Sequence, residues 1–322
     1  MSASEPFSAF MQRALYDPQR GYYTARIKTV GARGDFSTTA TLSTRLGKAV
    51  AAWLNNESRE TGARTVIEIG GGDGSLMKSV LDSLGWWQRM RLRVLMVESS
   101  PVLTSQQQTR LGKRVQGWFA TLPEALAACE GRALIYHNEL LDAFPVDVVH
   151  WDGTQWQEVW SRLGIDEELR ALPLPEPDSF SVLESRPDKP QRCELHTAVH
   201  AWLRHWLPQW KQGSMLTIDY GDDFPALYHR RPRGTLRAYL MQQRLEGADI
   251  FANPGRQDIT CDVNFTDVRS WLREHGTTEL SYETQGDFLD RLTPVASTQA
   301  DAWVAHRQGA GEAFRCLAVR RA

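Results

Sequence analysis

Val66-Ile-Glu-Ile-Gly-Gly-Gly-Asp-Gly-Ser-Leu76 is a short apolar run that passes directly into a glycine-rich turn. Because Gly70, Gly72 and Gly74 carry no side chain, the backbone can turn sharply here and come close to a ligand. The stretch predicts a buried strand over Thr65–Ile69 that ends in a ligand-binding loop. A glycine-rich turn without a ligand is the plain structural alternative.

The spacing of the glycines distinguishes two kinds of nucleotide-derived ligand. A dinucleotide fingerprint, GxGxxG, would need its third glycine at position 75, where this chain has Ser75. The spacing GxGxG, with Glu68 two residues before the first glycine, fits methyltransferases that bind S-adenosylmethionine. That ligand joins an amino acid to adenosine and has no pyrophosphate. The spacing therefore disfavours a nicotinamide-dependent dehydrogenase.

Glu98 follows one strand–helix unit later, at the end of a predicted strand over Leu92–Val97. A carboxylate in this position can accept hydrogen bonds from both hydroxyls of a ribose that lies across the strand ends. An ordinary surface acid is the alternative, and dehydrogenases also place an acid here. Glu98 therefore supports nucleoside binding without choosing between the two enzyme classes.

Strands and helices alternate from Thr65 onward. Strands are predicted at Thr65–Ile69, Leu92–Val97, near Val115, Arg132–His137, Ser214–Asp219, Glu279–Thr284 and Ala313–Arg320. Helices are predicted at Ser75–Leu84, from Pro101, at Leu122–Cys129, Thr197–Trp210, Phe265–His275 and within the insertion Phe288–Gln308. Because helices separate the first strands, we expect βαβ units and a parallel sheet.

Other segments interrupt this alternation. Residues 1–64 are predicted to form helices and loops, and Val148–Val159 a hairpin around Asp152-Gly153. Residues 222–262 are predicted to be irregular. We therefore expect an N-terminal helical segment at 1–64 and a second domain at 65–322, with insertions at about 144–196, 222–262 and 285–312.

The predicted fourth strand runs into His137-Asn-Glu-Leu-Leu-Asp-Ala-Phe-Pro145. In open parallel sheets, ligands bind at the carboxyl ends of the strands. Asn138 can hydrogen-bond a cofactor or orient a substrate nitrogen. Glu139 and Asp142 can face one pocket because they are three residues apart, and two carboxylates suit a guanidinium. Stabilising the N-terminus of a following helix is the alternative role for these acids.

Composition limits the possible partners. The net charge of −2 disfavours nucleic acid as the main partner. The four cysteines are far apart and the eight histidines lack ligand spacing, so we expect no metal site. No apolar stretch approaches the ~18 residues of a membrane span, and the N-terminus lacks a signal-peptide pattern, so a cytoplasmic location is expected.

Several motifs together resemble the MidA-like methyltransferases, a family that includes the arginine methyltransferase of mitochondrial complex I assembly. The resemblance extends over nearly the whole chain, and its motifs keep their order. They are Phe10-Met11, Leu15-Tyr16-Asp17-Pro18, Gly21-Tyr22-Tyr23, Gly34-Asp35-Phe36, Glu68–Gly74, Glu98, Asn138–Asp142, Pro145, Ile218-Asp-Tyr-Gly221, Gly234-Thr-Leu-Arg-Ala-Tyr239, Asn253-Pro-Gly255, Asp258-Ile-Thr260, Asp262, Phe265 and Thr284-Gln-Gly-Asp-Phe-Leu289.

The resemblance implies an α/β fold of the Rossmann-like class I methyltransferase type. Its sheet would be mostly parallel and seven-stranded with an antiparallel last strand, and the fold would add an N-terminal helical segment and an inserted cap. The implied cofactor is S-adenosylmethionine. Its implied ligands are Glu68, Gly70, Gly72, Gly74 and Glu98, with a closing loop of Gly34, Asp35 and Phe36.

The resemblance also implies a protein substrate. The methyl acceptor would be an arginine, as in the 49-kDa-type subunit of complex I that the mitochondrial relatives methylate. Asn138, Glu139 and Asp142 would line the acceptor site, where Glu139, supported by Asp142, would bind the guanidinium and take up its proton. The oligomeric state stays open, with a homodimer as one option.

One stretch departs from the family pattern. The family commonly follows Gly-Asp-Phe with Thr-Ser-Pro-Glu, whereas this chain has Thr38-Thr39-Ala40-Thr41. The missing proline and acid favour one alternative function, a non-catalytic assembly factor that keeps the cofactor as a structural element. A methyltransferase that acts on a small molecule is a further alternative.

Overall fold

The computed structural model describes residues 4–26, 43–162, 166–172, 180–241, 243–294, 296 and 298–322. The chain forms two compact units, each described by itself. The parallel-sheet unit comprises Lys28–Leu140, Arg204–Asp219 and Leu272–Ala322. The antiparallel unit comprises Met1–Ile27, Leu141–Leu203 and Tyr220–Trp271. The predicted domain boundary after residue 64 stays a prediction.

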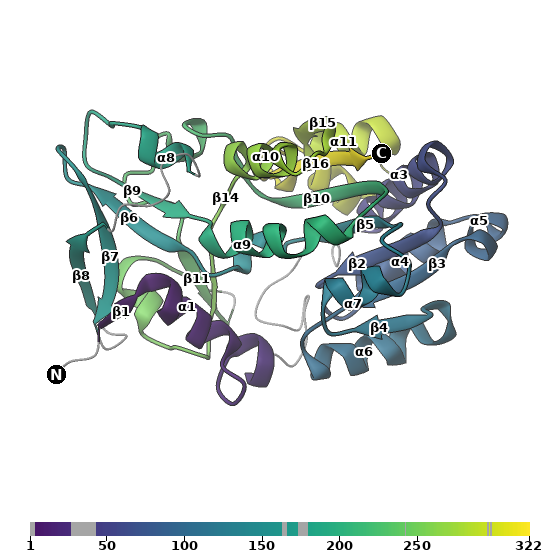
Figure 1. The fold of residues 1–322 in the computed structure, drawn as a ribbon, viewed down its shortest axis with the longest axis horizontal. Helices are drawn as coiled ribbons and strands as arrows, with labels where there is room; N and C mark the ends of the chain where they lie inside the picture. The colour runs from purple at the N-terminus through teal and green to yellow at the C-terminus, as the bar shows by residue number, and fades with distance from the viewer. Residues whose placement is uncertain are drawn as a thin grey trace. The chain divides into compact units, whose positions relative to one another are not determined.

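A sheet with the strand order β15-β16-β10-β5-β2-β3-β4 dominates the parallel-sheet unit (Figure 1). The strands are β2 (Thr65–Ile69), β3 (Arg93–Val97), β4 (Gly117–Phe119), β5 (Leu134–Asn138), β10 (Gly213–Asp222), β15 (Thr278–Thr284) and β16 (Phe314–Arg321). Neighbours from β4 to β10 are parallel, whereas β15 and β16 are antiparallel. The two-residue strand β14 (Val263–Asn264) pairs with Gly221 and Asp222 at the end of β10, and these four residues belong to the antiparallel unit. The predicted α/β fold is confirmed.

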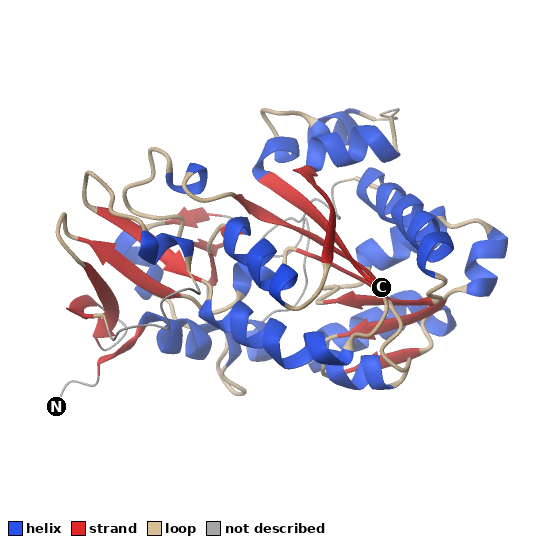
Figure 2. Ribbon diagram, turned by 45° about the horizontal axis from the view of Figure 1, so that its top comes forward, coloured by secondary structure: helices blue, strands red, loops and turns tan. Residues whose placement is uncertain are grey.

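Helices cover both faces of this sheet (Figure 2). They are α3 (Arg45–Thr61), α4 (Ser75–Ser83), α5 (Trp86–Arg91), α6 (Pro101–Leu111), α7 (Leu122–Ala127), α11 (Gln285–Leu292), α12 (Gln299–Ala305) and α13 (Ala310–Ala313). All five residues of β2 are buried, as expected of a parallel strand covered on both sides. The strand β2 therefore belongs to the core of this unit, and the glycine-rich loop follows it directly in the chain.

The antiparallel unit contains two further sheets. The larger has the order β1-β7-β6-β9 with β8 beside β7, and the smaller has the order β12-β11-β13. The strands are β1 (Ser4–Pro6), β6 (Asp147–Trp151), β7 (Trp156–Arg162), β8 (Asp166–Ala171), β9 (Gln191–Leu195), β11 (Arg237–Leu240), β12 (Gln243–Leu245) and β13 (Asp258–Thr260). The helices α1 (Phe7–Tyr16) and α8 (Ser181–Glu184) belong to this unit, whereas α9 (Thr197–Trp206) and α10 (Phe265–Glu274) cross its boundary.

Most predicted elements are present, and three expectations need correction. The predicted hairpin forms from β6 and β7. The strand expected near Val115 is β4, because a single 3-10 turn occupies Gly112–Arg114 and pairing with β3 starts at Gly117. Residues 1–64 contribute the strand β1 as well as helices.

The third correction concerns residues 222–262, which contain the small sheet rather than only irregular chain. Its strands have three or four residues and begin with charged or polar side chains, so they give no alternating apolar pattern. Within the described part of the chain, no helix is long and apolar enough to cross a membrane.

Candidate active site at the carboxyl ends of the strands

The glycine-rich loop begins where β2 ends. Gly70 donates its backbone N–H to the carbonyl of Val97 at 2.9 Å, and Gly74 donates to Gly71 at 2.8 Å. Gly70 and Gly72 have φ values of +64° and +53°, in the left-handed region that favours glycine. The loop thus has the tight backbone that the glycines predict.

Strand register brings the predicted site residues of this unit to one edge of the sheet. Ile69 of β2 pairs with Val97 of β3 and with His137 of β5. Because these strands are parallel, the residues that follow them emerge at the same edge. Gly70 and Glu98 follow β2 and β3 directly, and Asn138 is the last residue of β5.

Glu98 is held in place by two donors. Its Oε1 accepts from the backbone N–H of Ser100 at 2.9 Å, and its Oε2 accepts from Nε2 of Gln107 at 3.2 Å. The same Gln107 nitrogen donates to the carbonyl of Gly72 at 2.9 Å, so one side chain links the acid to the loop. Burial raises the pKa of Glu98 to about 7, although both hydrogen bonds oppose the shift.

Glu68 lies inside β2 with 1% of its surface exposed. Its Oε2 has no hydrogen-bond partner among the described residues. Burial, followed by the nearby charge of Glu98, raises the pKa of Glu68 to about 8. A buried carboxyl oxygen without a partner is unfavourable, and it indicates a site that accepts a hydrogen-bond donor from a ligand.

Sequence reasoning missed Gln107, although a signal was present. Leu103, Gln107 and Leu111 recur every four residues along α6, and all three are buried. An amide in the middle of an apolar helix stripe needs a buried partner, and Glu98 with Gly72 supplies it.

A second missed contact fixes the far end of the loop. Arg110 of α6 forms an ion pair with Asp73 at 2.8 Å and donates to Oγ of Ser75 at 2.6 Å. Asp73 in turn accepts from the backbone N–H of Ser75 at 3.0 Å. The loop is therefore attached to α6 at its middle, through Gly72, and at its far end, through Asp73, and these contacts keep its backbone preorganised.

Asn138 and Glu139 lie together where β5 ends. Nδ2 of Asn138 donates to Oε1 of Glu139 at 2.9 Å, while the buried Oδ1 of Asn138 has no partner among the described residues. Glu139 has a φ of +52°, which is uncommon for a residue other than glycine and is often found at functional sites. Its backbone N–H donates to Ile218, and Asp219 accepts from the next N–H, that of Leu140, at 3.0 Å.

Asp142 belongs to the antiparallel unit, where it is 8% exposed. Its Oδ2 accepts from Oγ1 of Thr260 at 2.7 Å. Burial raises the pKa of Asp142, while Thr260 and the charge of Arg237 oppose the shift. Arg237 itself is ion-paired with Asp262 at 2.5 Å. The structure thus places Asp142 in a network of buried polar side chains, and its place in an acceptor site stays a prediction. Gly34, Asp35 and Phe36 lie outside the described residues.

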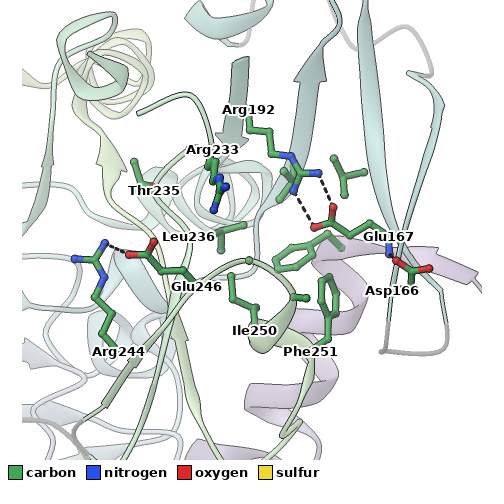
Figure 3. Close-up of a pocket in the computed structure, with 16 residues that line it drawn as sticks. Asp166, Glu167, Arg192, Arg233, Thr235, Leu236, Arg244, Glu246, Ile250 and Phe251 are labelled. Carbon is green, nitrogen blue, oxygen red and sulfur yellow. Dashed lines mark hydrogen bonds and ion pairs between the residues drawn. The ribbon is translucent and has the colours of Figure 1, made fainter. Parts of the chain in front are cut away.

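The antiparallel unit has a pocket of about 380 Å³ (Figure 3). Phe7, Ile250 and Phe251 contribute apolar surface to it. Two ion pairs border it, Arg192 with Glu167 and Arg244 with Glu246. None of the predicted site residues lines this pocket.

A family model described as "putative S-adenosyl-L-methionine-dependent methyltransferase" matches residues 46–283. A solved structure from Burkholderia thailandensis, bound to S-adenosyl-homocysteine, aligns with a TM-score of 0.85 and 26% identity, covering 99% of this chain and 88% of that one. A second structure from the same organism aligns with a TM-score of 0.82, also at 26% identity, covering 99% of this chain and 87% of that one.

Two curated relatives are named mitochondrial protein arginine methyltransferase NDUFAF7 homologues. The Drosophila melanogaster protein is 27% identical over 89% of this chain and 71% of its own length. The Caenorhabditis elegans protein is 26% identical over 80% of this chain and 65% of its own length. Because these relatives are named as mitochondrial, the predicted cytoplasmic location is contradicted.

Proposed function

Because this chain belongs to the family of putative S-adenosyl-L-methionine-dependent methyltransferases, we propose that it methylates an arginine side chain of a protein. The predicted methyltransferase activity and the S-adenosylmethionine cofactor are confirmed by this membership. The relatives named as protein arginine methyltransferases support the choice of acceptor. The single observation that carries the proposal within the chain is the pair Asn138 and Glu139, at the sheet edge that carries the glycine-rich loop.

The residues at this edge fit an adenosyl ligand. Glu98 can accept from the ribose hydroxyls, and the left-handed backbone of the loop leaves room for close approach. The unpartnered Oε2 of Glu68 offers a further acceptor beside them, and a protonated ammonium group is the donor it would suit best. We therefore propose Glu68, Gly70, Gly72, Gly74 and Glu98 as the cofactor ligands.

Asn138 and Glu139 offer the hydrogen-bond acceptors and the proton acceptor that a guanidinium needs as a methyl acceptor. When bound, the cofactor would supply an electrophilic methyl group, whose bond to the sulfonium sulfur breaks so that S-adenosylhomocysteine leaves. A guanidinium is protonated at neutral pH and its lone pairs are delocalised, so the acceptor nitrogen must be oriented and must lose a proton. The unpartnered Oδ1 of Asn138 would accept one N–H and fix the plane of the group. The carboxylate of Glu139 would bind another N–H and take up the proton that leaves as the new N–C bond forms.

Binding of the cofactor can be tested by calorimetry with S-adenosylmethionine, with NAD as the comparison ligand. We expect binding of S-adenosylmethionine and no heat from NAD, because the loop lacks the third glycine of the dinucleotide fingerprint. If the protein bound NAD and did not bind S-adenosylmethionine, the glycine-rich loop would not be a site for S-adenosylmethionine.

Affinity for a nucleoside should rise with pH if Glu98 binds the ribose. Hydroxyl donors favour the ionised carboxylate, whereas burial raises the pKa of Glu98 to about 7 in the free protein. The ionised fraction therefore grows as pH rises through this value, and binding should strengthen roughly tenfold between pH 6 and 8. The measurement is calorimetry with 5′-methylthioadenosine, which has no group of its own that titrates in this window.

The variant Glu98→Gln is the control for this dependence. Its amide keeps the shape of the side chain without the charge, so the change centred near pH 7 should disappear and the affinity should stay weak. A wild-type affinity that is equal at both pH values would exclude an ionised Glu98 as the ribose ligand.

A further inference from the structure

Helix α5 carries an exposed aromatic surface that packing does not explain. Trp86 is 61% exposed, Trp87 is 71% exposed and Met90 is 69% exposed. The two indole rings contact each other edge to face, with their centroids 4.4 Å apart. No residue of this helix is buried, so three large apolar side chains meet solvent within one and a half turns.

The helix is nevertheless held firmly against the parallel-sheet unit. Gln88 is half-buried, accepts from the N–H of Gly85 at 2.8 Å and donates to Asn55 of α3. Nε of Arg89 donates to the carbonyl of Leu84 at 2.9 Å. These contacts fix one side of the helix, and Trp86 and Trp87 take no part in them.

Positively charged residues flank the aromatic residues in the sequence. Arg89, Arg91 and Arg93 are exposed, and no acidic residue occurs between positions 84 and 93. Arg89 and Arg93 donate to carbonyl groups, which leave their charge uncompensated. Arg91 forms no hydrogen bond or ion pair with the described residues. The whole chain has a net charge of −2, so this cluster is a local feature rather than a reflection of composition.

We propose that Trp86, Trp87 and Met90, together with Arg89, Arg91 and Arg93, form a peripheral docking surface for an anionic lipid bilayer. Tryptophan partitions to the boundary between headgroups and hydrocarbon, where its ring is apolar and its N–H stays hydrated. Arginine adds electrostatic attraction to acidic headgroups. Charge complementarity favours this occupant, because three exposed arginines and no acidic residue lie among the apolar side chains at positions 84–93.

The position of α5 leaves the candidate active site free. The helix ends at Arg91 and β3 begins at Arg93, so α5 lies at the amino ends of the strands (Figure 1). Glu98 and the glycine-rich loop follow the carboxyl ends, one strand length away. A membrane-bound enzyme would therefore keep its sites for cofactor and acceptor accessible.

Vesicle flotation of the full chain tests the proposal, with phosphatidylcholine vesicles that contain or lack phosphatidylglycerol. We expect the wild type to float with the anionic vesicles and to be released as salt is raised. The double variant Trp86→Ser, Trp87→Ser should lower the bound fraction roughly tenfold, and Arg91→Glu should act in the same direction.

Two variants control for the loss of any tryptophan or any positive charge. Trp303, on α12, is 50% exposed, and Arg204, on α9, is exposed without an ion pair to the described residues. Trp303→Ser and Arg204→Glu should bind vesicles like the wild type, and all variants should bind 5′-methylthioadenosine unchanged. The proposal is overturned if the wild type floats with neither vesicle, if the double variant floats equally well, or if the surface instead holds two copies together in size-exclusion chromatography.

Discussion

Replacing Gly70 with valine should weaken binding of S-adenosylmethionine by roughly a hundredfold or more, and methyl transfer should fall with it. Gly70 has a φ of +64°, a conformation that a β-branched residue adopts only with strain. A Cβ at this position would lie 2.8 Å from Cδ1 of Leu140, beside the residues that end β5. The loop would have to move, and its hydrogen bond to Val97 would be lost with the ligand contacts. Calorimetry with S-adenosylmethionine measures the effect.

Gly62 offers a matched control for backbone strain. It ends α3 with a φ of +71°, and no atom lies within 4 Å of a Cβ built there. Gly62→Val should therefore lower thermal stability through the same kind of backbone strain while leaving cofactor affinity unchanged. If both variants lost the same affinity for S-adenosylmethionine, the loss would result from lower stability and not from the change in the glycine-rich loop.

Replacing Glu139 with glutamine should lower turnover by about a hundredfold or more while the affinity for S-adenosylmethionine stays unchanged. A positioned general base contributes on the order of 10²–10⁴ to a rate, and the amide can neither take up a proton nor balance the guanidinium charge. The cofactor ligands proposed above do not include this side chain. Single-turnover methylation assays and calorimetry separate the two quantities.

Glu130 is the matched control for this variant. It is also an acid with a left-handed backbone, at a φ of +57°, but it precedes β5 whereas Glu139 follows it. Glu130→Gln should leave turnover within about twofold of the wild type, as expected of an exposed surface change. Unchanged turnover in Glu139→Gln would remove Glu139 from the chemistry, even if the protein remains an active methyltransferase.

The sheet and the glycine-rich loop at its edge could be predicted because their signals are local. All residues of Thr65–Ile69 are buried and the glycines follow directly, so the strand and its loop can be predicted from eleven residues. Pro101 begins α6 as expected of a proline in the first turn of a helix. The antiparallel unit was less visible, because its three segments are far apart in the chain and its small sheet consists of very short strands.

The supporting side chains of the site depend on contacts between distant segments. Gln107 holds Glu98 and Gly72, and Asp219 holds the backbone after Glu139. Sequence patterns place such residues on an element but do not identify their partners. Asp142 also has a distant partner, because its carboxylate accepts from Thr260, 118 residues later, and its predicted place beside Glu139 in an acceptor site stays a prediction.

Transfer of a labelled methyl group from S-adenosylmethionine to protein arginine is the most direct measurement. The purified enzyme is added to lysate of cells that lack its gene, and the labelled protein is hydrolysed to amino acids. We expect the label in methylarginine, present with the wild type and with Glu130→Gln, and absent with Glu139→Gln. Bound cofactor without any labelled protein, or label in a small molecule or in another amino acid, would contradict a protein arginine methyltransferase.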